Sequence, residues 1–197
     1  MAGKAVQHFG PTPLGPVRAG ALVGVVLAGG EGRRFGGLKQ LHEIDGRPML
    51  ERVLGIVAAT GPEHRVVVLG ARAGTILERI DLQGALPVVC DRWDAGQAAS
   101  LHAGLDALPQ EAEWALVVLG DGPELDPRAV ERVLAAAVPG EDAIHAADYG
   151  GGRSHPVLIP RSRFGEIPDR GERPVRGLPA ETVDCRDLQP PGDVDYA

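Results

Sequence analysis

The chain has 197 residues, of which 44% are hydrophobic and 24% charged, and these values are typical of one globular domain with a real core. Its formal net charge of −7 argues against a nucleic-acid-binding surface, and no apolar run is long enough to span a membrane. Cys90 and Cys185 have neither C-x-x-C nor zinc-like spacing, so we interpret them as buried thiols in a reducing cytoplasm.

Residues 1–20 have no periodicity and lack the apolar core of a signal peptide, so we interpret them as a flexible arm before a single domain at 21–197. The Val-rich run from Val23 predicts a strand buried on both faces. A loop with five glycines, two arginines and Lys39 follows it. Glycines let backbone amides approach anionic oxygens, and the cationic side chains supply charge, so the loop is typical of a polyphosphate site.

Two familiar phosphate loops do not fit this sequence. A Walker loop needs Gly-Lys-Ser/Thr, but Lys39 lies between Leu38 and Gln40. The dinucleotide fingerprint has one residue too many between Gly32 and Gly36, and the next strand is followed by Arg72 where an acidic residue is expected. A nicotinamide site is weakened but stays open, because Arg72 could meet the 2′-phosphate of NADPH.

Strands and helices alternate after the loop. The apolar periodicity predicts helices over 49–58 and 73–80 and strands over 65–69 and 86–90. Such a rhythm requires parallel pairing with right-handed crossovers, so we predict an α/β fold with a single doubly wound, mostly parallel sheet. Ligands should then gather at the carboxyl ends of the strands.

The strand predicted over 114–119 ends in Gly120-Asp121. Asp121 therefore stands at the ligand edge of the sheet, where a carboxylate oxygen suits Mg²⁺, although Asp also favours turns. Farther on, Asp126 and Pro127 begin a predicted amphipathic helix to 137. A strand over 143–147 is joined by three glycines to a second at 155–159, and two later prolines interrupt any helix after residue 173.

Several segments together resemble the MobA-like nucleotidyltransferases, which attach a nucleotide to molybdenum cofactor. Residues 27–39 are similar to the L-A-[AG]-G-x-[SG]-x-R-[MF]-G-x-x-K signature, and residues 45–50 to the helix entry that follows it. Residues 90–105 resemble N-x-x-W-x-x-G-[MQ]-x-x-S-L-x-x-G-L, with Asp91 in place of Asn. Residues 119–123 resemble L-G-D-x-P, and His155 lies in a segment similar to G-x-x-x-H-P-V-L.

The resemblance implies an enzyme that uses Mg²⁺ to move a nucleoside monophosphate from CTP or GTP to a molybdopterin-type acceptor. The catalytic residues that it implies are Arg34, Lys39 and Asp121. The metal ligands are Asp121 and Asp193, although the acidic end is also compatible with an unstructured tail. His155 borders the acceptor, or makes a structural hydrogen bond. The nucleotide-binding residues are Leu27, Ala28, Gly29, Gly30, Gly32, Arg33, Ser100 and Gly120.

The resemblance leaves alternatives open. The paired glycines at 29–30 and 36–37 are similar to guanylyl-type members, whereas residues 93–105 and His155-Pro156 are similar to cytidylyl-type members and favour CTP. Ser100 could be an ordinary helix hydroxyl. Some MobA-like proteins are oxidoreductases on pigment-like quinoid compounds, and a nucleotide-binding homologue without catalysis is a third class. Transient contacts with molybdoenzymes or their chaperones are also expected from the resemblance.

Overall fold

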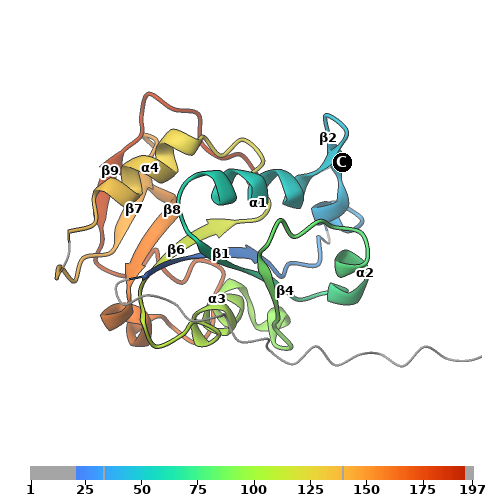
Figure 1. Cartoon of the computed structure of the whole chain (residues 1–197), viewed down its shortest axis with the longest axis horizontal. Helices are drawn as coiled ribbons and strands as arrows, with labels where there is room; N and C mark the ends of the chain where they lie inside the picture. The colour runs from blue at the N-terminus through green and yellow to red at the C-terminus, as the bar shows by residue number, and fades with distance from the viewer. Residues whose placement is uncertain (1–20, 33, 139, 194–197) are drawn as a thin grey trace, which may run out of the picture.

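The computed structural model describes residues 21–32, 34–138 and 140–193, so the predicted arm at 1–20 and Arg33 lie outside the described residues. Seven strands form one sheet in the order β5-β4-β1-β6-β8-β7-β9 (Figure 1). In chain order they are β1 (Ala21–Ala28), β4 (His64–Leu69), β5 (Leu86–Val89), β6 (Ala112–Leu119), β7 (His145–Asp148), β8 (Arg153–Pro160) and β9 (Glu181–Asp184). The strands β2 (Glu43–Ile44) and β3 (Arg47–Pro48) form a small separate ribbon.

The prediction of a mostly parallel, doubly wound sheet is confirmed. Strand β1 pairs in parallel with β4 and with β6, and β4 pairs in parallel with β5. Strand β8 is the exception, because it runs antiparallel to both β6 and β7. The chain proceeds from β1 to β5 on one side and returns to β6 on the other, so a crevice opens where the loops after β1 and β6 diverge.

Helices cover both faces of the sheet (Figure 1). Helices α1 (Met49–Ala59) and α4 (Pro127–Ala135) pack on one face, and α3 (Gln97–Asp106) packs on the other, while the short α2 is Ala73–Leu77. The sequence alternation decides the faces: Val26 and Ala28 of β1 join the core under α1, whereas Val25 and Leu27 join the core over α3. Side chains of β1 are therefore buried on both faces, as the apolar run predicts.

Element boundaries differ from the prediction in places. The helix predicted over 73–80 ends at Leu77, because the chain tightens there into a turn in which Arg79 N donates to Ile76 O at 3.0 Å. Helix α4 has the predicted cap, since the Asp126 side chain accepts from Arg128 N. The three glycines form the predicted turn between β7 and β8, and Cys90 and Cys185 are buried and free, as expected. Three-residue turns of 3₁₀ helix occur at Lys39–Leu41 and Trp93–Ala95, and a longer one at Arg161–Glu166.

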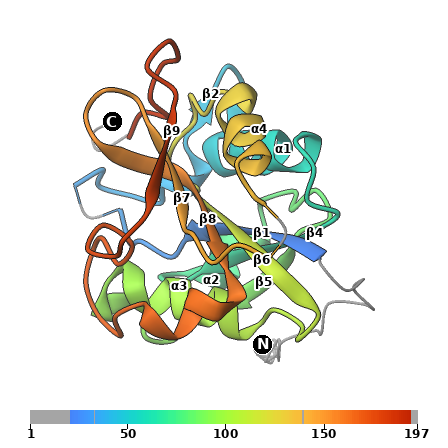
Figure 2. The ribbon, with the colours of Figure 1, turned by 90° about the vertical axis from the view of Figure 1, so that its left-hand side faces the viewer.

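The segment after β9 returns to the carboxyl edge of β6 (Figure 2). Arg132 of α4 makes two hydrogen bonds to the Asp187 carboxylate and one to the carbonyl of Asp184 at 3.0 Å. Leu188 is buried beside α4, and Glu124 N donates to Pro191 O at 3.0 Å. These contacts carry the chain back to the loop that follows β6 and place Asp193 there.

None of the helices within the described ranges has both the length and the apolar character that a membrane crossing requires.

Candidate functional site

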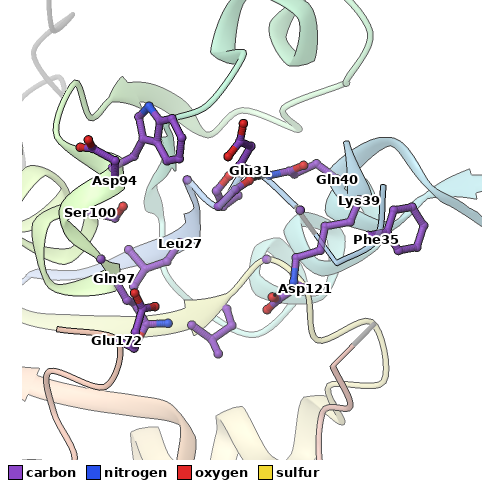
Figure 3. A pocket seen from close by; sticks show the side chains of 18 of the residues that line it. Leu27, Glu31, Phe35, Lys39, Gln40, Asp94, Gln97, Ser100, Asp121 and Glu172 are labelled. Atoms are coloured by element: carbon purple, nitrogen blue, oxygen red, sulfur yellow. Dashed lines mark hydrogen bonds and ion pairs between the residues drawn. The ribbon is translucent and has the colours of Figure 1, made fainter. Parts of the chain in front are cut away.

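A cavity of about 420 Å³ lies at the carboxyl ends of β1 and β6 (Figure 3). Most of the residues that the sequence singles out contribute to its wall. They are Leu27, Ala28, Gly29, Gly30, Gly32, Arg34, Lys39, Ser100, Gly120 and Asp121. Arg33 lies outside the described residues. Asp193 contacts the Lys39 ammonium but is not in the cavity wall, and His155 lines a different cavity. The crevice expected from the sheet topology is therefore the place where these residues converge.

The loop after β1 is compact because its glycines have no side chains. Gly32 has φ +67°, and a Cβ there would lie 2.4 Å from Gly37 O. A Cβ on Gly29 would lie 2.7 Å from Ser100 Oγ. Gly120 N donates to Leu27 O at 2.8 Å. The Gly120 amide is therefore used in the contact between β6 and β1 and does not bind a ligand. Glycine is needed here for close packing as well as for access to a ligand.

Gln40 holds the loop from beneath. Its side chain is 3% exposed, and its Nε2 donates to Ala28 O at 2.9 Å and to Gly30 O at 2.8 Å. Gly29 O accepts from Ala71 N at 3.2 Å, so three successive carbonyl groups are engaged by the protein. Among the described residues, the Gly30 amide has no hydrogen-bond partner, which leaves it for an anionic ligand. Sequence reasoning missed Gln40, because a glutamine after a lysine carries no signal of its own.

Lys39 and Asp121 form an ion pair at one end of the cavity (Figure 3). Their side chains are 14% and 25% exposed, and Asp193 Oδ1 lies 3.4 Å from the same ammonium nitrogen. Burial lowers the pKa of Lys39, but the hydrogen bond and charge of Asp121, with those of Asp193, outweigh burial and raise it above its ordinary value. Lys39 is therefore a cation at neutral pH, flanked by two carboxylates.

The opposite end of the cavity contains Trp93, Asp94, Gln97, Ser100 and Glu172. Ser100 is 5% exposed and lines the cavity wall, and in the described part of the chain its side chain makes no hydrogen bond. The hydroxyl can therefore take a partner from the cavity. Trp93 approaches Gly70 so closely that a Cβ on that glycine would lie 2.4 Å from Trp93 Cβ.

Glu172 reaches this end from a segment far along the sequence. Gly171 O accepts from Ala98 N at 2.9 Å, and His102 Nε2 lies 3.1 Å from Ile167 O and 3.7 Å from Asp169 Oδ1. His102 thus connects α3 to this segment. Sequence reasoning did not place Glu172 in the site, because the segment has no regular structure and its periodicity gives no position.

His155 lies in a second cavity of about 160 Å³, beside Ser154, Leu125 and Pro191. Burial lowers the pKa of its imidazole, and neither the hydrogen bond with Val117 O at 3.3 Å nor the charge of Asp121 outweighs it. The ring is therefore neutral at pH 7. The two cavities share Leu119 in their walls, so His155 borders the nucleotide-sized cavity without lining it.

A glycine-rich loop, an ammonium group and a carboxylate at the switch point of a parallel sheet define an α/β nucleotide-binding protein. The family model described as "MobA-like NTP transferase domain" matches residues 24–182. The chain belongs to this MobA-like NTP transferase family.

Three relatives illustrate the breadth of the family. Nicotine blue oxidoreductase of Paenarthrobacter nicotinovorans is 33% identical over 190 residues, which cover 88% of this chain and 92% of that protein. Molybdenum cofactor guanylyltransferase of Rhodobacter capsulatus is 38% identical over 133 residues, which cover 66% of this chain and 63% of that protein. The bifunctional GlmU protein of Kineococcus radiotolerans is 34% identical, but the chain spans only 25% of its length.

Among solved structures, Rv0371c from Mycobacterium tuberculosis H37Rv has a TM-score of 0.78 at 27% identity, with 90% of this chain and 94% of that chain covered. Its complex with manganese has a TM-score of 0.71 at 26% identity, with 83% and 88% covered. Both similarities extend over most of the two chains compared.

Proposed function

We propose that this chain is a Mg²⁺-dependent nucleotidyltransferase that moves a nucleoside monophosphate from CTP or GTP to a phosphorylated acceptor of the molybdopterin type and releases pyrophosphate. The observation that carries the proposal is the meeting of Lys39 and Asp121 at the mouth of the glycine-rich loop. A cation and a hard-oxygen ligand beside the Gly30 amide suit a metal-bound triphosphate.

The residues present fit Mg²⁺. Asp121 and Asp193 both approach the Lys39 ammonium, so two carboxylates already share one cationic position. Within the described ranges, no cluster of three or more His, Cys, Asp or Glu side chains is suited to a metal. Mg²⁺ binds with one or two carboxylates plus phosphate oxygens and waters, so this pair is the donor set that a nucleotide-bound ion needs. The manganese complex of Rv0371c supports a divalent ion at such a fold.

The chemistry proposed is an in-line displacement. A phosphate oxygen of the acceptor forms a bond to the α-phosphorus, and the bond to the β-phosphate oxygen breaks, so that pyrophosphate leaves with the electron pair. Because the nucleophile is already an anion, no general base is needed. Bound Mg²⁺ would neutralise negative charge on the phosphates. Lys39 offsets the charge that develops at the α-phosphoryl group, and Arg34 and the Gly30 amide bind the outgoing phosphates.

The identity of the substrates is proposed from the family pattern. Residues 93–105 favour CTP, whereas the relative in Rhodobacter capsulatus is a guanylyltransferase. Molybdopterin is proposed as the acceptor on the strength of that relative, and His155 would contact it from the adjoining cavity. A fold and a phosphate loop alone do not identify an acceptor.

An oxidoreductase is the second candidate, because the relative that matches this chain over 190 residues is named nicotine blue oxidoreductase. Arg72 could meet the 2′-phosphate of NADPH, but it does not line either cavity. The ion pair of Lys39 and Asp121 has no role in hydride transfer, whereas it suits triphosphate chemistry. The transferase is therefore the function that the geometry supports best.

The two candidates are separated by ligand binding. With Mg²⁺ present, we expect one of CTP, GTP, ATP and UTP to raise the melting temperature selectively, by the amount that its concentration and affinity dictate. NADPH should leave it unchanged. Pyrophosphate release in the presence of molybdopterin then tests transfer itself. Stabilisation by NADPH alone would favour the oxidoreductase, and triphosphate binding without pyrophosphate release would indicate a nucleotide-binding protein without catalysis.

Gln40 offers a test of how the loop is held. The Gln40→Met variant keeps the side-chain length but removes both hydrogen bonds to Ala28 and Gly30. We expect the free energy of unfolding to fall by about 1–2 kcal/mol, and turnover to fall by up to about 10²-fold because the loop amides lose their orientation. Calorimetry and pyrophosphate release measure the two effects.

Gln83→Met is the matched control, since Gln83 Nε2 also donates to a backbone carbonyl, that of Glu51 at 2.7 Å, but lines neither cavity. It should lose stability and keep turnover. If Gln40→Met likewise lost only stability, Gln40 would have no role in positioning the loop.

A further inference from the structure

The two ends of the main cavity differ in chemistry. Lys39 and Asp121 lie at one end, while Asp94, Gln97 and Glu172 lie at the other (Figure 3). A metal-bound triphosphate placed at Lys39 therefore directs its nucleoside to an end that is rich in hydrogen-bond acceptors. Asp94 and Glu172 have no cationic partner among the described residues, so their charges disfavour phosphate groups at that end.

Glu172 is the member of this end that comes from outside the β1–β6 core. The segment before it is fixed to α3, since Gly171 O accepts from Ala98 N at 2.9 Å and Ile167 O lies 3.1 Å from His102 Nε2. A Cβ on Gly96, which has φ +102°, would lie 3.2 Å from Glu172 Oε1, so the absence of a side chain at Gly96 leaves room for the carboxylate. These contacts hold Glu172 beside Gln97 at the cavity wall.

The Glu172 carboxylate is available for a ligand. In the part of the chain that the structure describes, it makes no hydrogen bond or ion pair, and the same is true of Asp94. The Ser100 side chain, 5% exposed and at the same end, also makes no hydrogen bond within the described residues. Two open carboxylates and a hydroxyl without a protein partner at one end of a cavity indicate a ligand that brings several N–H or O–H groups.

We propose that Glu172 determines nucleotide specificity by accepting a hydrogen bond from a donor on the nucleoside. Both the ribose hydroxyls and the exocyclic amino group of the base supply such donors. The proposal rests on the proposed function, because it takes the triphosphate to lie at Lys39. A carboxylate that accepts from either group favours a ribonucleotide with an amino-bearing base and disfavours analogues that lack the donor.

The test compares the wild type with Glu172→Gln, which keeps the shape and removes the charge. Dissociation constants are measured calorimetrically with Mg²⁺ for CTP, 2′-deoxy-CTP and UTP. If GTP is the triphosphate that binds, the set is GTP, 2′-deoxy-GTP and ITP. We expect the wild type to bind the nucleotide that carries all the donors about 10- to 100-fold more tightly than the analogue that lacks the contacted donor. Hydrogen bonds to charged groups supply a difference of this size.

The variant decides which donor is involved. The amide oxygen of glutamine still accepts a hydrogen bond, but more weakly than a carboxylate. A preference for CTP over 2′-deoxy-CTP that falls in Glu172→Gln therefore places the contact at the ribose. A preference for CTP over UTP that falls places it at the base amino group. Glu166→Gln is the control, because Glu166 lies on the same segment, pairs with Arg163 and does not line the cavity, so both ratios should be unchanged.

Two results would overturn the inference in distinguishable ways. If the wild type binds triphosphates and Glu172→Gln preserves both ratios, Glu172 is not a specificity residue, but the proposed function stands. If the wild type binds none of the triphosphates, the proposed function fails and the inference fails with it. Because Glu172 is exposed, the substitution should leave the melting temperature unchanged, and an unchanged value shows that the variant is folded.

Discussion

The Asp121→Asn variant is expected to lose about 10³-fold or more of its pyrophosphate-releasing turnover, because charge neutralisation by a bound metal is worth several kcal/mol in the transition state. The asparagine keeps the shape of the side chain and still accepts a hydrogen bond from Lys39, so the fold should survive. The Lys39 ammonium then loses the larger of the two carboxylate charges that raise its pKa, and that pKa should fall. Turnover is measured as pyrophosphate release with Mg²⁺ and molybdopterin.

The control is Asp106→Asn, an exposed aspartate at the far end of α3 from the cavity. It removes the same charge and should leave turnover unchanged. Near-identical circular dichroism of both variants shows that folding is not the cause of the loss. Wild-type turnover in Asp121→Asn would contradict the proposed function, since no other carboxylate follows β6 at the cavity edge.

The sheet could be predicted because its evidence is local. Val23 to Ala28 is apolar on both faces, and alternation with helices leaves only parallel pairing with crossovers for most strands. The antiparallel β8 follows from the glycine turn after β7, since a tight turn returns the chain beside itself. The residue at which α2 ends could not be predicted, because packing decides whether the last turn is α-helical or 3₁₀.

The candidate site divides in the same way. The residues after β1 and β6 could be placed together, because carboxyl ends of adjacent parallel strands share an edge. Gln40 and Glu172 could not be placed from the sequence. Gln40 acts through hydrogen bonds to backbone carbonyl groups twelve and ten residues away, and Glu172 lies on a segment without periodicity. Their positions depend on tertiary contacts, such as the bond from Ala98 N to Gly171 O, that no local pattern encodes.

The ion pair between Lys39 and Asp121 reports on the order of the strands. Lys39 lies in the loop after β1, and Asp121 follows β6, so 82 residues separate them in the chain. Only a sheet in which β1 and β6 are neighbours brings them into one ion pair. Asp193 reaches the same ammonium through the segment that Arg132 fixes to α4. Three parts of the chain therefore determine the charge at one position.

The Gly32→Ala variant is expected to lose nearly all triphosphate binding while the core stays folded. Gly32 has φ +67°, where an alanine costs about 1–2 kcal/mol, and the new Cβ would lie 2.4 Å from Gly37 O and 3.5 Å from Lys39 N. The backbone between Gly37 and Lys39 must therefore move, and it carries the ammonium away from Asp121. Calorimetry with Mg²⁺ and the triphosphates measures the affinity, and thermal unfolding measures the core.

Gly36→Ala is a matched control for this loop. Its φ of +76° imposes a similar backbone strain, but a Cβ there would have no neighbour within 4 Å. Both variants should show a similar small loss of stability, whereas only Gly32→Ala should lose affinity, because only there does the new atom displace the residues before Lys39. Equal affinities in the two variants would mean that the position of the Gly37–Lys39 backbone does not govern triphosphate binding, and the loop would then bind its ligand through Gly30 and Arg34 alone.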